Sequence, residues 1–364
     1  MIIIYTVTFL LFFLPLLVLP LSNFIFESSK VILAEILIEL LLIFTLFRYP
    51  LSKLKASLIR FWPLLGLLLL TTADLILYPS PTSFFGNSFR LQGIFLLWHL
   101  MFFSFLSVNI GLDQKLKLIY PVSLVALFLG TLILGGNDAQ RAIGTLGEPN
   151  ALAACVIFIW PFAFLIPPSS KKVYKLLIIL ISLAIILLSG SRSGLLAILI
   201  QLVFIALTKF KPQSLGKFTL VALILIAASL ILPVKEGGGW YENRSEVWTT
   251  ATSAGLQSPI LGWGFGNLEY ALKQASSLLG NNIRYQYVDS SHNFLLDYWV
   301  QGGVLGASLI LIIITLSLKG LIKKRNRLLI SAFVGVLTVM SFNPVSVVTL
   351  LAFWFLIGQG LSSE

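Results

Sequence analysis

Residues that build metal sites and soluble surfaces are scarce in this sequence. Only 11% of its 364 residues are charged, and it has one cysteine, Cys155, and two histidines, His99 and His292. A single cysteine excludes an intrachain disulfide and a cysteine metal cluster. The two histidines are 193 residues apart and the carboxylates are scattered, so no metal-ligand spacing is present. The sequence therefore predicts neither a metal site nor a cofactor.

Long apolar runs make up most of the sequence. Hydrophobic residues make up 58% of the chain, and its mean hydropathy is +0.98. A helix needs about 20 apolar residues to cross roughly 30 Å of hydrocarbon, and runs of about this length recur along the whole sequence. We therefore expect an all-α polytopic membrane protein. Residues 1–364 would form a single membrane domain, and the first apolar run would be a span, not a removed signal peptide.

About twelve transmembrane helices fit the hydropathy pattern. They are predicted near residues 2–21, 31–47, 59–78, 91–110, 117–134, 150–167, 174–189, 193–208, 216–233, 293–317, 328–341 and 344–360. Residues 234–292 are the one long polar stretch, which we interpret as a large extracytoplasmic loop.

Two short amphipathic helices are predicted inside this loop. RSEVWTTATSAGLQ has apolar residues at roughly helical spacing, and NLEYALKQASSLLG is a second such segment that ends at Gly280. We expect the second helix to lie flat on the outer membrane face. Between the two, the proline and three glycines of SPILGWGFGN predict a tight turn.

The basic residues indicate which loops face the cytoplasm. Lys and Arg number 25 against 14 Asp and Glu, and 17 of the 25 fall in alternate short loops. This bias is an orientation signal in membrane proteins, so we expect both termini inside and no nucleic-acid partner. The remaining eight lie in the predicted outward loops, where orientation does not explain them. They are Lys30, Arg90, Arg141, Arg192, Lys235, Arg244, Lys273 and Arg284.

Arg192 lies in SGSRSG, a tight turn between two apolar segments on the predicted outer side. One interpretation is an interfacial arginine that buries its stem and keeps its head in water. The alternative is an anion site. A guanidinium between small residues at a helix amino terminus adds its forked donors to free backbone N–H groups.

Arg244 and His292 stand near the two ends of the loop's folded part. Arg244 is flanked by Glu242 and Glu246, so a solvated local ion pair is the simpler interpretation. His292 precedes an apolar run, and a histidine there is often only a packing or capping residue. Its imidazole is also suited to accept a proton from a hydroxyl near neutral pH, with a neighbouring carboxylate holding the tautomer. Ser290 and Ser291 would then cap the helix.

Glu35, Glu39 and Asp74, together with His99 and Asp297, fall inside predicted spans. Ionisable groups in a membrane are costly and usually face a polar cavity or each other, so a proton-coupled transporter is one hypothesis. Against it, the sequence has no evident inverted repeat and no matching Gly/Pro breaks in two halves.

Five motifs in order along the chain resemble the O-antigen ligase and polymerase superfamily of bacterial inner-membrane glycosyltransferases. They are RAIGTLGEPNALA at 141–153, SGSRSG at 189–194, RSEVW, SPILGWGFGN and SSHNFLLDYWVQGGVLG. Family members similarly have an arginine-bearing turn, and a large outward loop that starts with R-x3-W, contains P-x2-G-x-G-x-G and closes on H-N. The similarity covers roughly residues 140–310. Glu148 departs from it, because relatives often carry a small or amide residue there.

This resemblance implies a GT-C-like fold and a glycan donor linked to a polyprenyl diphosphate such as undecaprenyl diphosphate. The glycan would pass to an acceptor at the outer face of the cytoplasmic membrane without a metal. Arg192 and Arg244 would contact the diphosphate, and His292 would activate the acceptor hydroxyl, with inversion if displacement is direct. Substrate contacts are expected from Arg141, Asn150, Trp248 and Asn293.

The acceptor is left open by the sequence. A ligase would use another lipid, as in lipopolysaccharide biosynthesis, a polymerase would join repeat units, and an oligosaccharyltransferase would use a protein. Two hypotheses come from other classes of protein. A polyprenol-linked glycan flippase or other transporter would depend on Glu35, Glu39 or Asp74 for its activity. An inactive scaffold protein would depend on none of the residues named above.

Overall fold

The computed structural model of the protein describes residues 2–48, 61–108, 110, 119–135, 141–165, 172–209, 244–280 and 289–362. Within these ranges every regular element is a helix, and none is a strand. The predicted all-α fold is confirmed.

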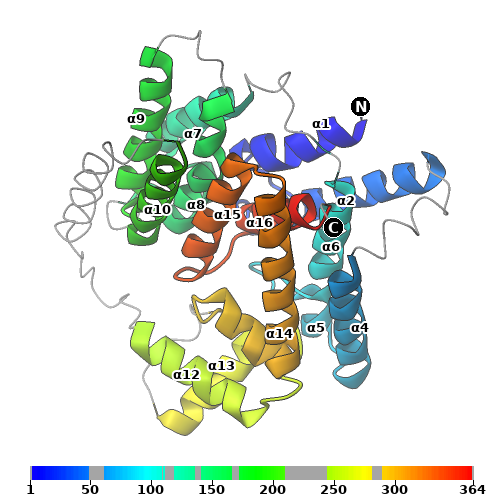
Figure 1. Ribbon diagram of the computed structural model, residues 1–364. Helices are drawn as coiled ribbons and strands as arrows, with labels where there is room; N and C mark the ends of the chain where they lie inside the picture. Colours follow the sequence, from blue (N-terminus) through cyan, green and yellow to red (C-terminus); the bar gives the residue numbers. More distant parts are fainter. Residues whose placement is uncertain are drawn as a thin grey trace.

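Figure 1 shows the helices of these ranges in chain order. Up to residue 165 they are α1 (Ile2–Thr8), the π-helical η1 (Phe9–Phe13), η2 (Leu14–Leu16), α2 (Ser28–Arg48), α4 (Trp62–Leu77), α5 (Pro81–Phe85), α6 (Ile94–Leu106), α7 (Ile119–Leu134), η5 (Gly144–Leu146), α8 (Pro149–Ile159) and η6 (Trp160–Leu165). After it come α9 (Lys172–Ser189), α10 (Arg192–Lys209), α12 (Arg244–Gln257), α13 (Leu268–Leu279), α14 (Phe294–Lys323), α15 (Arg327–Met340) and α16 (Val347–Leu361).

Eleven of the twelve predicted spans coincide with helices, and the one near 216–233 lies outside the described residues. By length and composition, α14 is the one described helix that can cross a membrane by itself. Most of the other apolar helices are 10–17 residues long. The helical segments are therefore confirmed, whereas twelve membrane crossings stay a prediction.

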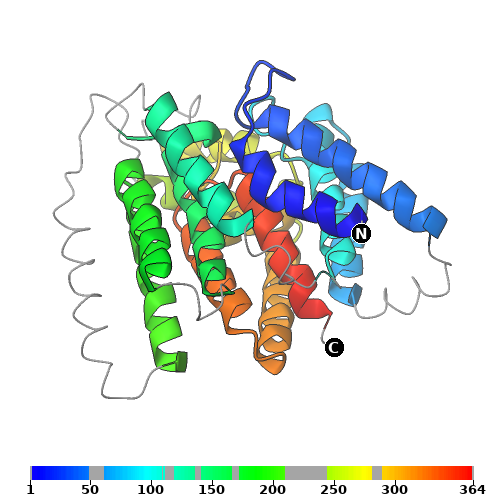
Figure 2. The same cartoon turned by 90° about the horizontal axis from the view of Figure 1, so that it is seen from above.

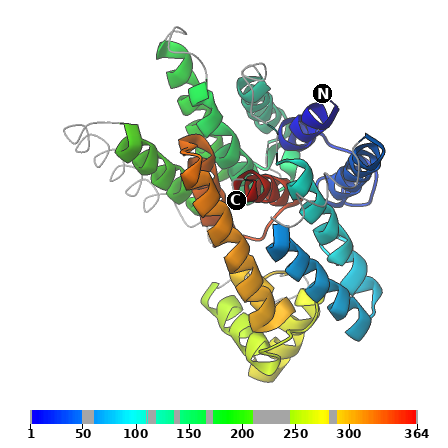
Figure 3. The same ribbon diagram turned by 45° about the vertical axis from the view of Figure 1, so that its right-hand side comes forward.

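Helix α16 lies at the centre of the bundle, between the blue and the green helices of Figures 2 and 3. All its residues except Leu350 are buried, and it packs against α6, α8, α14 and α15. Two glycines permit this close packing, because a Cβ at Gly358 would collide with Ser104 O and one at Gly360 with Ser317 O. Small residues at helix contacts are typical of membrane bundles, which need close backbone approach.

The two predicted loop helices exist as α12 and α13, and Gly280 ends α13 in the left-handed conformation. They lie side by side at one end of the bundle, against the start of α14 (Figures 1 and 3). A small separate core joins them, made of Val247, Ala251, Ala254, Leu268, Ala271, Leu272, Ala275 and Val300. Leu268, Ala271, Leu272 and Ala275 of α13 are buried in this core, and its position flat on the outer membrane face stays a prediction.

The glycine-rich turn after α12 docks into a break in α14. Trp263 N and Gly264 N donate to the carbonyls of Val300 and Gln301, at 2.9 Å each, and Val304 N donates to Pro259 O at 2.8 Å. At the same place Gly303 leaves the helical conformation, with φ +59°. The turn therefore supplies the hydrogen bonds that the broken helix loses.

Candidate active site

The SGSRSG turn connects α9 to α10 and holds Arg192 at a helix amino terminus. Gly190 turns the chain in the left-handed conformation, with φ +59°. Ser191 then caps α10, because its hydroxyl accepts a hydrogen bond from Gly194 N at 3.3 Å. Arg192 is the first residue of the helix and is exposed. The predicted arrangement of an arginine beside the backbone N–H groups of a helix start is therefore present.

Arg141 and Asn150, from the segment before and within α8, contact this turn directly. Arg141 Nε donates to Ser189 O at 2.9 Å, and Arg141 Nη2 donates to Asn150 Oδ1 at 3.2 Å. The same Asn150 oxygen accepts from the Ser191 hydroxyl at 3.1 Å. Two motifs that are about 40 residues apart in sequence thus form one polar unit.

Asn343 joins this unit from the connection between α15 and α16. Its Nδ2 donates to Ser193 Oγ and, at 3.2 Å, to Val339 O. Sequence reasoning did not select Asn343. The available signal was its place in SFNPV, since an Asn-Pro pair between two apolar runs marks a turn with a polar side chain.

Helix α12 brings Arg244 and Trp248 to the same region. The pKa of Arg141 is lowered, first by burial and also by the positive charge of Arg244, while Glu148 opposes both. Trp248 lies one turn after Arg244, half-buried, with its ring centroid 6.5 Å from that of Phe342, the neighbour of Asn343. We call Arg141, Asn150, Arg192, Arg244 and Asn343 the arginine cluster.

His292 lies in a tight turn before α14. It is 7% exposed and has φ +59°, which non-glycine residues rarely adopt. Ser290 Oγ accepts from His292 N at 2.9 Å, and Asp297 Oδ1 accepts from Ser291 N at 2.8 Å. A conformation costing about 1–3 kcal/mol that is held by such contacts is a frequent property of functional positions.

Asn293, and not Ser290 or Ser291, caps α14. Its Oδ1 accepts from Leu295 N at 3.0 Å and from Leu296 N at 3.3 Å. The interpretation of the two serines as caps was wrong, because both hydroxyls bond within the turn itself: Ser291 Oγ donates to Asn293 O at 2.9 Å. The carboxamide of Asn293, a predicted substrate contact, is engaged by the helix start.

Arg90 was not selected as a site residue from the sequence, although it was one of the outward basic residues without an explanation. It is 8% exposed and pairs with Asp289, three residues before His292, at 2.5 Å. A second carboxylate, Glu148, lies 3.7 Å from it. Burial opposes its charge, but Asp289, Glu148 and Glu27 outweigh burial and raise the pKa of Arg90. The negative charge of Glu148 also raises the pKa of Arg141. This carboxylate therefore interacts electrostatically both with the arginine cluster and with Arg90, which pairs with Asp289 before the His292 turn.

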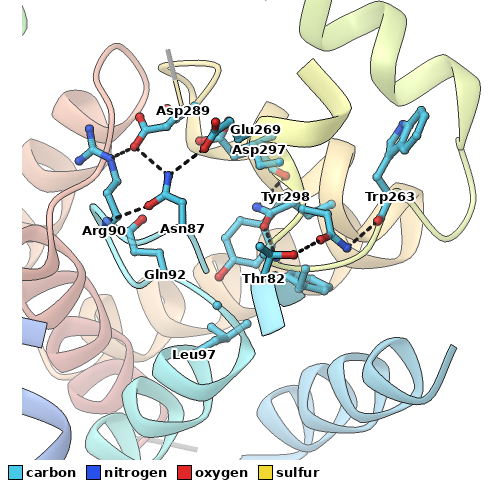
Figure 4. Close-up of a pocket in the computed structure, with 18 of the residues that line it drawn as sticks. Thr82, Asn87, Arg90, Gln92, Leu97, Trp263, Glu269, Asp289, Asp297 and Tyr298 are labelled. Carbon is cyan, nitrogen blue, oxygen red and sulfur yellow. Dashed lines mark hydrogen bonds and ion pairs between the residues drawn. The ribbon is translucent and has the colours of Figure 1, made fainter. Parts of the chain in front are cut away.

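A cavity of about 1030 Å³ opens beside this ion pair (Figure 4). Asp289, Ser290 and Phe294, which surround His292 in sequence, line it, as does Arg90. The seven predicted site residues are not on its walls. The structure thus places the arginine cluster outside the cavity and the His292 turn at its margin.

Of the carboxylates in the predicted spans, Asp297 lines this cavity, whereas three others lie elsewhere. Asp74 Oδ2 accepts from Phe265 N at 2.5 Å and so holds the glycine-rich turn, while Glu39 Oε1 lies 3.1 Å from His99 Nε2. Glu35, Glu39 and Asp74 are absent from the cavity walls. Over the described part of the chain, no three His, Cys, Asp or Glu side chains are grouped to hold a metal ion.

A family model described as O-antigen ligase matches residues 177–311. This range begins in α9, contains SGSRSG and the loop helices, and ends in α14. The match confirms the resemblance to the O-antigen ligase and polymerase superfamily, whose members are integral to the inner membrane of bacteria. No curated protein matches the chain.

Proposed function

We propose that this protein, a helical membrane protein similar to the O-antigen ligases over residues 177–311, is a glycosyltransferase with a polyprenyl-diphosphate-linked glycan as donor. The acceptor is a hydroxyl group at the outer face of the cytoplasmic membrane, and both chain termini lie in the cytoplasm. The observation that carries the proposal is the hydrogen bond from Arg141 to the SGSRSG turn, in which Arg192 begins α10, together with the electrostatic effect of Arg244 on Arg141.

The arginine cluster suits the leaving group. When the bond between the anomeric carbon and the phosphate oxygen breaks, its electron pair stays on that oxygen and makes it negative. Guanidinium groups bind such oxygens with paired donors, and the first N–H groups of α10 add a favourable dipole. Because these donors are already in place, little reorganisation is needed as charge develops.

His292 is proposed as the general base. The acceptor oxygen forms the new bond to the anomeric carbon while its proton passes to the imidazole, which leaves the donor diphosphate as the other product. The negative charge of Asp297, whose electrostatic interaction with His292 is favourable, stabilises the resulting imidazolium. A direct displacement of this kind inverts the anomeric configuration.

The superfamily contains both ligases and polymerases, so the proposal has two forms that differ only in the acceptor. A ligase transfers the glycan to a different lipid, and a polymerase transfers it to another polyprenyl-linked glycan. A protein acceptor is a third form. In each form the donor is the same, and Arg192, Arg244 and His292 have the same roles.

The test is transfer by purified protein in lipid vesicles, with a polyprenyl diphosphate glycan and each acceptor class in turn. We expect Arg192→Ala, Arg244→Ala and His292→Gln to lower turnover by about 10²-fold or more, the effect typical of removing a charge-stabilising or proton-transfer group. Arg48→Ala, an exposed arginine at the end of α2, is the matched control and keeps its turnover. Full turnover by all three folded variants would refute the proposal, and added chelator tests the metal-free mechanism.

A further inference from the structure

The 1030 Å³ cavity is bounded by loop elements on one side and by the bundle on the other. Its mouth is formed by the end of α4, by α5, by the glycine-rich turn and by the start of α13. Its floor is closed by nearly fully buried side chains of the bundle. These are Leu96, Leu100, Phe294, Met340 and Trp354. At the upper end of the ~300–1000 Å³ range of small-molecule sites, it has room for more than one sugar ring.

Aromatic rings stand on the walls of the mouth. Tyr270 is 57% exposed and Tyr78 is 41% exposed, and they come from different elements. Trp263 meets Tyr270 edge to face with ring centroids 6.0 Å apart, and its Nε1 donates to Ala254 O at 2.8 Å, which fixes the indole plane. Rigid aromatic faces with one polar end provide large contact area for a ligand with an apolar face and polar edges.

Polar groups between these rings are held in fixed positions. Gln92 Nε2 donates to Val345 O at 2.6 Å, and Gln301 Oε1 accepts from Gly266 N at 2.8 Å. Asn87 Nδ2 lies 3.3 Å from Glu269 Oε2 and 3.4 Å from Asp289 Oδ2 (Figure 4). A carboxylate has about four acceptor sites, so Glu269 and Asp289 retain capacity for hydroxyl donors.

The charge of the cavity differs from that of the arginine cluster. The acidic and basic side chains on its walls, apart from tyrosines, are two cations, Arg90 and Lys273, and three carboxylates, Glu269, Asp289 and Asp297, which sum to −1 when all five are charged. Both cations are engaged, Arg90 with Asp289 and Lys273 with Glu269. An anionic ligand such as a phosphate or a uronic acid would therefore meet net repulsion.

From these observations we infer that the cavity is a carbohydrate site for uncharged sugar rings of the acceptor. The rings stack on Tyr270, Tyr78 and Trp263, and their hydroxyls donate to the carboxylates. The His292 turn at its margin separates this site from the arginine cluster. The assignment to the acceptor rests on the proposed function, whereas carbohydrate binding by the cavity does not.

The binding test uses purified full-length protein and a neutral tetrasaccharide of N-acetylglucosamine as the probe. We expect Tyr270→Ala and Tyr78→Ala each to weaken binding by roughly threefold to tenfold, the effect of one lost aromatic contact. Tyr270→Phe keeps the ring and keeps most of the affinity. Leu278→Ala changes a 74% exposed residue of the same helix outside the cavity and has no effect.

A tetrasaccharide of galacturonic acid is the anionic comparison and should bind at least tenfold more weakly than the neutral probe. The inference is overturned if the neutral probe does not bind, if it binds Tyr270→Ala and Tyr78→Ala as it binds the wild type, or if the anionic probe binds equally well.

A second probe, farnesyl diphosphate, separates this inference from the proposed function. We expect Arg192→Ala and Arg244→Ala to weaken its binding, and Tyr270→Ala to leave it unchanged. If the arginine variants bind it normally, the proposed function fails although the sugar site stands. If Tyr270→Ala raises the KM of the donor and not that of the acceptor in the transfer assay, the acceptor assignment is overturned.

Discussion

Arg90 and Asp289, 199 residues apart in the chain, form an ion pair with 2.5 Å between Nε and Oδ2. The pair joins the segment before α6 to the turn that presents His292. Its side chains are only 10% and 16% exposed. The position of His292, the proposed base, therefore depends on Arg90, an arginine that has no role in the proposed mechanism.

Arg90→Ala should lower both stability and transfer. Removing one partner of a buried ion pair leaves the other charge uncompensated, at a cost of about 3–5 kcal/mol. We expect Arg90→Ala to lower the unfolding temperature in detergent clearly, whereas Lys273→Ala, which breaks a half-exposed pair with Glu269, changes it little. A double-mutant cycle with Asp289→Ala measures the coupling free energy between Arg90 and Asp289. Additive effects of the two substitutions would show that the ion pair does not stabilise the protein.

Gly262→Ala should disrupt the docking of the glycine-rich turn on α14. Gly262 has φ +76°, and a Cβ there would collide with Gln301 O. The strained conformation and the backbone collision together predict that the free energy of unfolding falls by about 2 kcal/mol or more. Gly280→Ala is the matched control, because Gly280 has φ +61° in open space, so only the conformational cost of about 1 kcal/mol applies. Thermal unfolding of both variants measures the difference, and equal losses would show that the collision is relieved.

Asp74→Asn distinguishes transfer from transport. Asp74 holds Phe265 N through Oδ2, and an asparagine oxygen can accept the same hydrogen bond without titrating. A proton-coupled transporter that used Asp74 would lose its activity in this variant. We expect Asp74→Asn to retain most transfer activity and Asp74→Ala to lose stability by about 1–3 kcal/mol, since a buried N–H loses its partner. Loss of activity by a well-folded Asp74→Asn variant would favour the transporter.

Glu27 should make stability depend on pH. Burial raises the pKa of this carboxyl to about 7 from 4.5, against the lowering effect of Arg90 and the hydrogen bond from Val347 N. The folded protein therefore holds a proton that the unfolded chain releases at lower pH. Its stabilising contribution is complete below pH 4.5 and is lost between pH 4.5 and about 7, amounting to about 3 kcal/mol.

Glu27→Gln, which keeps an acceptor for Val347 N, should flatten this dependence and be the more stable form at pH 8. Denaturant unfolding of the wild type and of Glu27→Gln at pH 5 and pH 8 measures how the free energy of unfolding of each depends on pH. Parallel curves would show that Glu27 is ionised in the folded state throughout this range.

Local patterns predicted the helices well. Eleven hydropathy segments and both loop helices match observed elements, down to the start of α12 at Arg244 and the end of α13 at Gly280. Helix ends depend on glycine, proline and capping residues within a few positions, so they can be read from neighbours in the chain. The packing of α13 against α12 and α14 was not indicated by the sequence, because periodicity shows that a face is apolar and not what covers it.

The sequence indicated most residues of the candidate site but not the contacts between them. The sequence by itself determined the helical segments and the residue types suited to a diphosphate and a hydroxyl, because both follow from composition, short-range spacing and motif order. Only the tertiary structure decided that Arg141 contacts the turn of Arg192, that Asn343 joins them, and that Arg90 pairs with Asp289 beside a cavity. These contacts join residues 48 to 199 positions apart. No local periodicity encodes such distances, since they depend on how whole helices pack around α16.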